Sequence, residues 1–221
     1  MTLGRPRFHL RETTSTNDRA RELAARGAPH GAIVTAGVQT AGRGRQGRTW
    51  TAPPGTALLV SIVLRDAPGL LPLRAGLAVA DLSGPPARVK WPNDVLVEGR
   101  KVAGILAEGR PAEGWTVLGI GVNAALDVSA LPPELRAGAA SLGRAPEAVL
   151  TELLGALETW IAPPEDAVVD ALRARDALLD RPVRWADGEG IGAGIDADGA
   201  LLVRRADGST ARLDAGEVHL S

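Results

Sequence analysis

The run TALLVSIVL at residues 56–64 constrains the fold more than any other stretch of the chain. It is nearly continuous in apolar residues and includes β-branched side chains, a pattern typical of a strand that is buried on both faces. We therefore expect this segment to be a central strand of a sheet.

The rest of the first 180 residues alternates between helical and extended patterns. A helix is expected over residues 15–26, because Ser15 or Thr16 can cap its first turn and Gly27 stands at the stop position. Clustered glycines, prolines and arginines predict a loop over residues 39–55. Strands are expected at residues 31–38, 87–89 and 115–123, a hairpin at 95–108, and helices at 69–82, 145–161 and 164–179.

The composition changes near Arg181, where turn signals begin to recur every few residues in ADGEG, DADG, ADGST and DAG. Short apolar stretches lie between these turns, and several short strands with tight turns suggest a small barrel. We therefore expect a larger domain over residues 1–179 and a small β-barrel domain over residues 180–221.

Charge and composition exclude several classes of protein. The net charge of −1 provides no overall field toward nucleic acid or an anionic membrane. The chain has no cysteine, which excludes disulfides, thiolate metal sites and a cysteine nucleophile. The N-terminus lacks the apolar core of a signal peptide, and no apolar run approaches the roughly 18 to 20 residues of a membrane span. A soluble cytoplasmic protein without membrane attachment is expected.

Three residue types are rare in this chain: it has 23 arginines but only two lysines, three asparagines and two glutamines. A GC-rich coding bias replaces lysine, asparagine and glutamine wherever a substitute is tolerated, so those that remain are expected where their chemistry is needed. They fall in four short segments, STN (15–17), QTAGRGRQGR (39–48), KWPNDVLVEGRK (90–101) and GIGVN (119–123).

The segment GRGRQGR at residues 42–48 combines three glycines with three arginines. Glycine permits close backbone approach, and the arginine fork suits phosphate or carboxylate. These residues predict a mobile cationic loop that closes over a polyphosphate, although the phosphate-binding pattern GxxxxGK[ST] is absent. A solvated basic turn or an RNA-binding patch remains an alternative.

Lys90 and Asp94 bracket a Trp-Pro turn in KWPND, and are expected to lie close together at the opening of a site. Lys101 begins the apolar strand KVAGILAE, and if it points inward it needs an anionic partner. A surface salt bridge at the turn and a lysine that faces water are the alternatives.

Two further segments suit a flat, neutral polar ligand. GIGVN has glycine at alternate positions of a strand, which leaves one face bare for a flat ligand or for ordinary packing. STN offers two hydroxyls, an amide and free backbone N–H groups at a helix start, which suit a polar head group or a simple N-cap.

Taken in order and spacing, STN, QTAGRGRQGRTW, KWPND, GRKVAGIL and GIGVN resemble the biotin protein ligases over about residues 13–123. The resemblance is to a short form that lacks the N-terminal DNA-binding domain. It implies an α+β fold, with a mixed β-sheet flanked by helices like that of class II aminoacyl-tRNA synthetases and a small C-terminal SH3-like β-barrel. The expected reaction is ATP-dependent biotinylation of a lysine on a biotin carboxyl carrier protein, or on the carrier domain of a biotin-dependent carboxylase. It proceeds through biotinyl-5′-AMP and requires Mg²⁺.

The resemblance assigns roles to individual positions. Lys101, Arg45 and Asp94 are expected to be catalytic, with Asp94 near the metal or the incoming lysine amine. Arg48 is expected to grip pyrophosphate, and Trp50 to form an aromatic wall. The implied biotin-binding residues are Ser15, Thr16, Asn17, Gln39, Gly42, Arg43, Gly119 and Gly121. The implied nucleotide-binding residues are Arg43, Gly44, Arg45, Arg48, Trp50, Lys90, Asn93, Lys101 and Asn123.

Two alternatives remain. A lipoate or octanoate ligase or transferase has a related reaction on the same fold, but the polar pair Thr16 and Gln39 suits a ureido group better than an aliphatic chain. An RNA-binding module is disfavoured by the net charge and by the scarcity of Phe and Tyr. Only about a dozen residues precede STN, so no DNA binding is expected. A monomer and a homodimer both fit the sequence.

Overall fold

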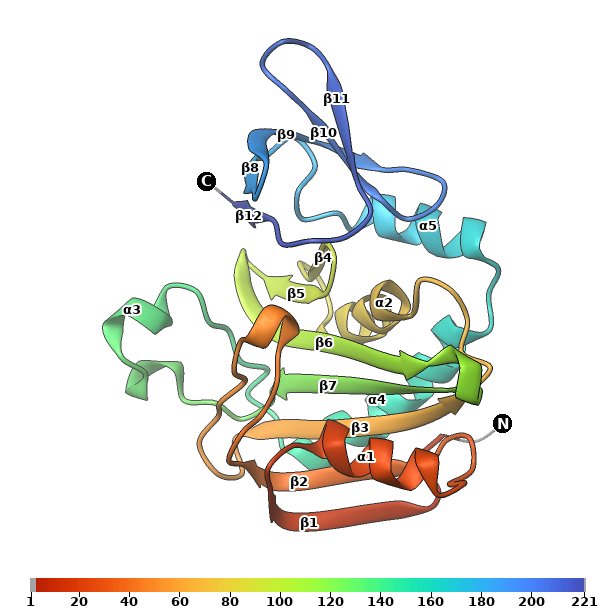
Figure 1. The fold of residues 1–221 in the computed structure, drawn as a ribbon. Helices are drawn as coiled ribbons and strands as arrows, with labels where there is room; N and C mark the ends of the chain where they lie inside the picture. Colours follow the sequence, from red (N-terminus) through yellow and green to blue (C-terminus); the bar gives the residue numbers. More distant parts are fainter. Residues whose placement is uncertain (1–2, 221) are drawn as a thin grey trace.

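The computed structural model describes residues 3–220 (Figure 1). One sheet contains β1 (Arg7–Thr13), β2 (Ile33–Gln39), β3 (Ala57–Arg65), β4 (Arg88–Lys90), β5 (Asp94–Val97), β6 (Arg100–Arg110) and β7 (Trp115–Asn123). A second sheet contains β8 (Pro182–Trp185), β9 (Gly188–Ile195), β10 (Leu201–Arg204), β11 (Thr210–Leu213) and β12 (His219–Leu220). The helices are α1 (Thr16–Ala25), α2 (Leu71–Ser83), α3 (Pro133–Arg136), α4 (Pro146–Ile161) and α5 (Glu165–Ala174).

The larger sheet is mixed, with strand order β1-β2-β3-β7-β6-β5-β4. Strands β1 and β2 are parallel, and the other neighbouring pairs are antiparallel. Strand β3 pairs with β2 on one side and with β7 on the other, and all of its residues from 57 to 64 are buried. The prediction of a buried central strand is confirmed.

Helices cover both faces of this sheet, so alternate side chains of β3 enter two different apolar cores. Leu58, Val60 and Ile62 pack in the core that also contains apolar residues of α2 and α4. Val63 packs on the opposite face with Ala20 of α1. In Figure 1, α1 lies in front of the sheet and α4 lies behind it. Within residues 3–220, no helix has the length and apolar character needed to cross a membrane.

The smaller sheet is antiparallel, with order β11-β10-β9-β8-β12, and it confirms the expected small C-terminal β-structure. It is held against the larger part of the chain through Trp91, which is buried and donates from Nε1 to the carbonyl of Gly199 at 3.1 Å. The Trp-Pro turn of KWPND is therefore fixed by contact with the turn that joins β9 to β10. A domain boundary between residues 179 and 180 stays a prediction.

One expectation about local structure was wrong, and one strand was not expected. The helix expected over residues 164–179 ends at Ala174, because the next residues run alongside β4 and bond to Val89. The Val89 amide donates to the Arg175 carbonyl at 2.8 Å, and the Ala177 amide donates to the Val89 carbonyl at 3.0 Å. Strand β1 was not expected, since it is an edge strand whose residues are mostly exposed, and its polar–apolar alternation is limited to RFHLR.

Asp176 in this extended segment gives a prediction about stability. Its side chain is buried, and Oδ1 accepts from the Leu178 amide at 2.8 Å, but Oδ2 has no hydrogen-bond partner. Burial raises the pKa of Asp176, an effect that backbone hydrogen bonds from Leu178 and Leu179 and the charge of Arg88 oppose. The folded state therefore holds this proton more tightly than the unfolded chain does. The resulting stabilisation is complete below the ordinary carboxyl pKa, about 3.9, and is lost as pH rises through the folded value.

We expect Asp176→Asn to stabilise the fold at pH 8, because it keeps an acceptor for Leu178 and removes the buried charge. The gain should be about 1 kcal/mol, or roughly 2–4 °C in melting temperature, and should shrink at pH 4. Thermal unfolding at both pH values measures it, with the exposed Asp187→Asn as the control. An equal gain at the two pH values would contradict this origin.

Candidate functional site

A cavity opens on the α1 side of the larger sheet, over β3, β7 and β6, and reaches the C-terminal residues 217–219. It collects residues from the start of α1, the loop 39–55, the turn of KWPND and the two glycine-containing strands. The predicted site residues that line it are Ser15, Thr16, Asn17, Gln39, Arg43, Gly44, Arg45, Arg48, Trp50, Lys90, Asn93, Asp94, Lys101, Gly119 and Gly121. Gly42 and Asn123 are not among its lining residues.

Clustering of the rare residue types is a useful guide to this cavity. Of the seven lysines, asparagines and glutamines in the chain, five line it: Asn17, Gln39, Lys90, Asn93 and Lys101. The other two are Gln46 and Asn123. The interpretation that these residues persist where their chemistry is needed agrees with their placement.

One end of the cavity is a buried network of uncharged polar groups. The Thr16 amide and hydroxyl both donate to Gln39 Oε1, at 2.7 and 3.0 Å. The Ser61 hydroxyl lies 2.8 Å from Thr16 Oγ1 and 2.6 Å from Asn17 Oδ1. These bonds fix the two side chains at the start of α1. Sequence reasoning missed Ser61, although a serine inside an otherwise apolar strand is a signal that was available.

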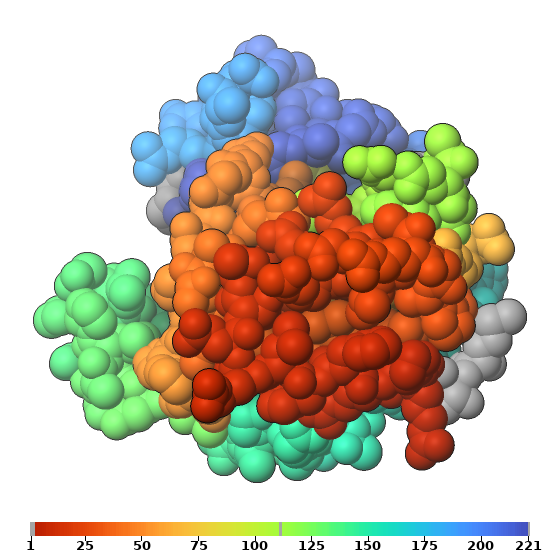
Figure 2. All heavy atoms as spheres, turned by 60° about the horizontal axis from the view of Figure 1, so that its bottom comes forward, coloured from red at the N-terminus to blue at the C-terminus, as the bar shows by residue number. Residues whose placement is uncertain are grey.

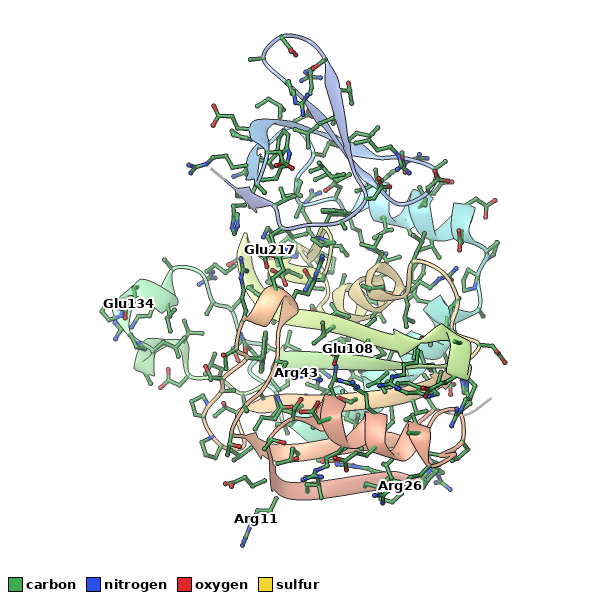
Figure 3. All side chains as sticks on the ribbon, viewed as in Figure 1. Arg11, Arg26, Arg43, Glu108, Glu134 and Glu217 are labelled. Atoms are coloured by element: carbon green, nitrogen blue, oxygen red, sulfur yellow. The ribbon has the colours of Figure 1, made fainter. Side chains whose placement is uncertain are left out.

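Glu108 on β6 is a second residue that sequence reasoning missed. It joins this network to the glycine-rich loop, GRGRQGR at residues 42–48. It accepts from Asn17 Nδ2 at 2.7 Å and from Arg43 at 2.9 Å. Arg43 also pairs with Asp18 at 2.7 Å, so its charge is already balanced by two carboxylates. Figure 3 labels Arg43 and Glu108, which lie close to each other beside α1. Arg43 therefore anchors the loop to the sheet and to α1.

The bare glycine face of β7 accommodates two side chains of the protein itself. A Cβ at Gly121 would lie 2.6 Å from the ring of Trp50, and a Cβ at Gly119 would lie 2.8 Å from Asn17 Cγ. Gly104, the register partner of Gly121 on β6, also faces Trp50. The indole thus forms a wall of the cavity, in agreement with its expected place, and can lie this close only because the strands have no side chains there.

The other end of the cavity is cationic. Lys101 Nζ lies 2.7 Å from Asp94 Oδ1, and Lys90 Nζ lies 3.9 Å from Asp94 Oδ2, so the expected proximity of Lys90 and Asp94 is confirmed. Burial lowers the pKa of Lys90, with Lys101 and Arg48 adding to the effect and Asp94 opposing it. The lining residues include five lysines and arginines but only two acidic residues, Asp94 and Glu217. The cavity therefore favours an anionic ligand.

Residues of the C-terminal part complete this cationic end. Arg48 forms an ion pair with Glu217, and Glu217 Oε2 lies 3.7 Å from His219 Nε2. In Figure 2 the loop, in orange, reaches the blue C-terminal residues. The sequence offered no signal for this contact, because 169 positions separate the two partners.

Asn123, an expected nucleotide contact, lies outside the lining of the cavity. Its amide is buried and donates to the carbonyls of Lys101 and Ala140, at 3.3 and 3.0 Å. The Lys101 amide also donates to the Gly138 carbonyl, and the Ala140 amide donates to the Lys101 carbonyl, both at 2.8 Å. Asn123 therefore helps to fix the backbone that carries Lys101.

Comparison with known proteins gives consistent matches. The family described as Biotin/lipoate A/B protein ligase matches residues 10–125, and the Biotin protein ligase C terminal domain matches residues 178–221. The biotin–[acetyl-CoA-carboxylase] ligase of Mycobacterium tuberculosis is 37% identical, over 94% of this chain and 86% of that protein. The enzyme of the same name from Paracoccus denitrificans is 38% identical, over 88% of this chain and 92% of that protein.

A solved structure agrees with these matches. The biotin protein ligase from Aquifex aeolicus in complex with biotin and ATP has a TM-score of 0.82 and 26% identity. The similarity covers 98% of this chain and 100% of that one. It therefore extends over both sheets.

Proposed function

Because the chain belongs to the biotin/lipoate A/B protein ligase family, we propose that it attaches biotin to a lysine of a carboxylase carrier domain, using ATP and passing through biotinyl-5′-AMP. The observation that carries the proposal is one cavity with a neutral polar end and a cationic end. A molecule that enters it must present an uncharged polar group at one end and an anion at the other. Biotin does so with its ureido ring and its carboxylate.

The neutral end would hold the ureido ring. Thr16, Gln39 and Asn17 present hydroxyl and amide groups that can donate to and accept from such a ring, and their mutual bonds hold them in place before the ligand arrives. Ser15 lies beside them and is buried. Trp50 and the glycine face of β7 would enclose the apolar part of the ligand.

The cationic end would catalyse formation of the adenylate. The biotin carboxylate attacks the α-phosphorus of ATP, and pyrophosphate leaves. Two anions must approach each other, so fixed positive charges lower the energy of the transition state. We propose that Lys101 and Arg45 contact the carboxylate and α-phosphate. Arg48 would leave Glu217 and contact the departing pyrophosphate.

The residues present fit a Mg²⁺ ion that arrives bound to the triphosphate. No cluster of three metal-ligating side chains occurs within residues 3–220, and Asp94 is the carboxylate that lies beside Lys101 and Lys90, two of the predicted nucleotide contacts. Mg²⁺ is ordinarily held through one or two carboxylates together with substrate phosphates. When bound, the ion would neutralise charge on the triphosphate, and Asp94 is the residue we propose as its protein ligand.

In the second step the carrier lysine attacks the carbonyl carbon of biotinyl-AMP, and AMP leaves. Asp94 lies next to Lys101, where the carbonyl group of biotinyl-AMP would be bound. It forms ion pairs with Lys101 and Lys90, and it can also orient the incoming amine. Its two roles, toward metal and toward amine, both remain proposals. A cytoplasmic location, the absence of DNA binding and the choice between monomer and homodimer stay predictions.

One experiment tests the function directly. The protein is incubated with MgATP and an acetyl-CoA carboxylase carrier domain, with biotin in one arm and lipoate in the other. We expect the carrier to gain the mass of one biotinyl group, and none in the lipoate arm. A gain only with lipoate would favour the lipoate-ligase alternative, and no gain in either arm, with an intact carrier lysine, would refute both. Retention of labelled RNA on a filter tests the RNA-binding alternative.

The contact between Gly119 and Asn17 gives a prediction about affinity. Because an added Cβ would meet the Asn17 amide, Gly119→Ala should displace that amide from Ser61 and Glu108. We expect biotin affinity to fall by a factor of about ten or more, equal to at least about 1.4 kcal/mol. Titration calorimetry measures the affinity. Gly155→Ala is the matched control, since a Cβ there meets nothing within 4 Å, and it should bind like the wild type. Unchanged affinity in Gly119→Ala would show that Asn17 does not face the ligand.

A further inference from the structure

His219 brings an imidazole from the C-terminal part of the chain into the wall of the cavity. It lies on the short strand β12, where its register partner is Arg184 of β8. Its Nε2 lies 3.7 Å from Glu217 Oε2, next to the position where Glu217 meets Arg48 of the glycine-rich loop. Its side chain is 57% exposed, so a molecule that approaches the cavity from outside can reach it.

Other groups in the cavity that can accept a proton already pair with cations. Asp94 lies between Lys101 and Lys90, at 2.7 and 3.9 Å. Glu217 pairs with Arg48. Among the described residues that line the cavity, the imidazole is the one side chain that can be neutral and basic near pH 7.

The charges around His219 favour its neutral form. Burial lowers the pKa of His219, and the positive charges of Lys90, Arg48 and Arg184 lower it further. Glu217 faces it with a negative charge at 3.7 Å, but this carboxylate is shared with Arg48. A neutral imidazole has a free lone pair, which is the requirement for accepting a proton.

Building on the function proposed above, we propose that His219 is the general base of the transfer step and takes the proton that the carrier lysine loses. The lysine ammonium gives a proton to the imidazole, and the amine nitrogen forms a bond to the carbonyl carbon of biotinyl-AMP. The bond between that carbon and the phosphate oxygen breaks, AMP leaves with the electron pair, and the second proton of the nitrogen passes to solvent water, which leaves the amide. The imidazolium then returns its proton to water.

The location of His219 suits this step better than the first one. Adenylate formation joins a carboxylate to a phosphate and needs no base, whereas a lysine with a pKa of about 10.4 is almost fully protonated at neutral pH. The carrier lysine must enter from solvent, and the side chain of His219 is more exposed than those of Lys90 and Lys101. The negative phosphate of the adenylate would also offset part of the surrounding positive charge and make the imidazole a stronger base during transfer.

The experiment separates the two steps with the full chain. Enzyme carrying biotinyl-AMP is mixed with excess carrier domain, and the rate of transfer is measured in a single turnover. Pyrophosphate release without carrier measures the first step. We expect His219→Gln to lower the transfer rate about 100-fold and to leave pyrophosphate release unchanged. His9→Gln, an exposed histidine on the edge strand β1, is the matched control and should transfer like the wild type.

The pH dependence identifies the chemical role. The wild-type transfer rate should fall as pH drops through a pKa below the ordinary imidazole value of about 6.5, and this fall should be absent in His219→Gln. Added imidazole should restore part of the transfer rate of His219→Ala. An unchanged transfer rate, the same pH dependence in the variant, or an equal loss in both steps would each overturn the proposal. A wild type that makes no biotinyl-AMP would instead refute the proposed function on which it rests.

Discussion

Lys101→Ala is expected to lower the rate of biotinyl-AMP formation about 100- to 1000-fold, the effect typical of removing one preorganised group that stabilises a charged transition state. Lys101 Nζ projects from β6 beside Asp94 and lies 5.6 Å from the centre of the Trp50 ring. Its backbone amide and carbonyl are hydrogen-bonded to Gly138 and Ala140, so the side chain that carries the ammonium starts from a fixed backbone. In the proposed reaction this placement would let it meet the carboxylate and the α-phosphate without reorganisation.

Pyrophosphate release in the presence of biotin and MgATP measures this rate, and thermal unfolding measures the fold. The Lys101 side chain is 36% exposed, so its loss should change the melting temperature far less than the rate. Lys101→Arg keeps the positive charge and should recover part of the activity. Release at the wild-type rate from Lys101→Ala would exclude a role for its charge in adenylate formation.

Arg45→Gly is expected still to form biotinyl-AMP, at a lower rate because one cation is lost, but to release it into solution. Within residues 3–220 the Arg45 guanidinium forms no ion pair or hydrogen bond, whereas Arg43 and Arg48 of the same loop are held by carboxylates. Burial lowers the pKa of Arg45, and the charge of Asp94 opposes this. Arg45 is therefore available to the adenylate phosphate. A charge-assisted hydrogen bond of this kind is worth roughly 1.5–3 kcal/mol, or about ten- to a hundredfold in retention of the intermediate.

Serum albumin, which is not a substrate, detects the released adenylate. The variant is incubated with biotin, MgATP and albumin, and biotin on albumin is measured by blotting. Wild type and Arg45→Lys, which keeps the charge, should label albumin weakly, and Arg45→Gly should label it strongly. If albumin stays unlabelled while Arg45→Gly still releases pyrophosphate, Arg45 does not retain the intermediate.

Local sequence patterns predicted the elements that are set by uniform burial or by a local stop signal. Strand β3 is buried on both faces, and its apolar run shows this directly. Helix α1 begins at Thr16 and is followed by Gly27 with a φ of +86°, as the stop signal indicates. Strand β1 gave only the five-residue alternation RFHLR, because an edge strand with one neighbour buries few side chains. The end of α5 was misplaced because pairing with Val89, a long-range contact, decides it.

For the cavity, the sequence predicted which residues gather but not how they pair. Three arginines of one short loop have different electrostatic environments: Arg43 faces Asp18 and Glu108, Arg48 faces Glu217, and Arg45 is left for a ligand. Each acidic partner lies outside the loop, so spacing within the motif cannot reveal it. The motif does not reveal the partners of Asn123 either. The hydrogen bonds of its side-chain amide depend on how residues 138–140 pass β6.

The two lysines of the chain both lie in the cavity, and this affects how the protein would respond to its own reactive product. Biotinyl-AMP acylates exposed amines, and the rest of the surface is built with arginine, which does not react in this way. Apart from the chain's α-amino group, every amine is thus in the cavity where we propose that the anhydride is made. A variant that releases the adenylate would therefore biotinylate neighbouring proteins much more than itself. That property is useful in a reagent that identifies which proteins lie close together in a cell.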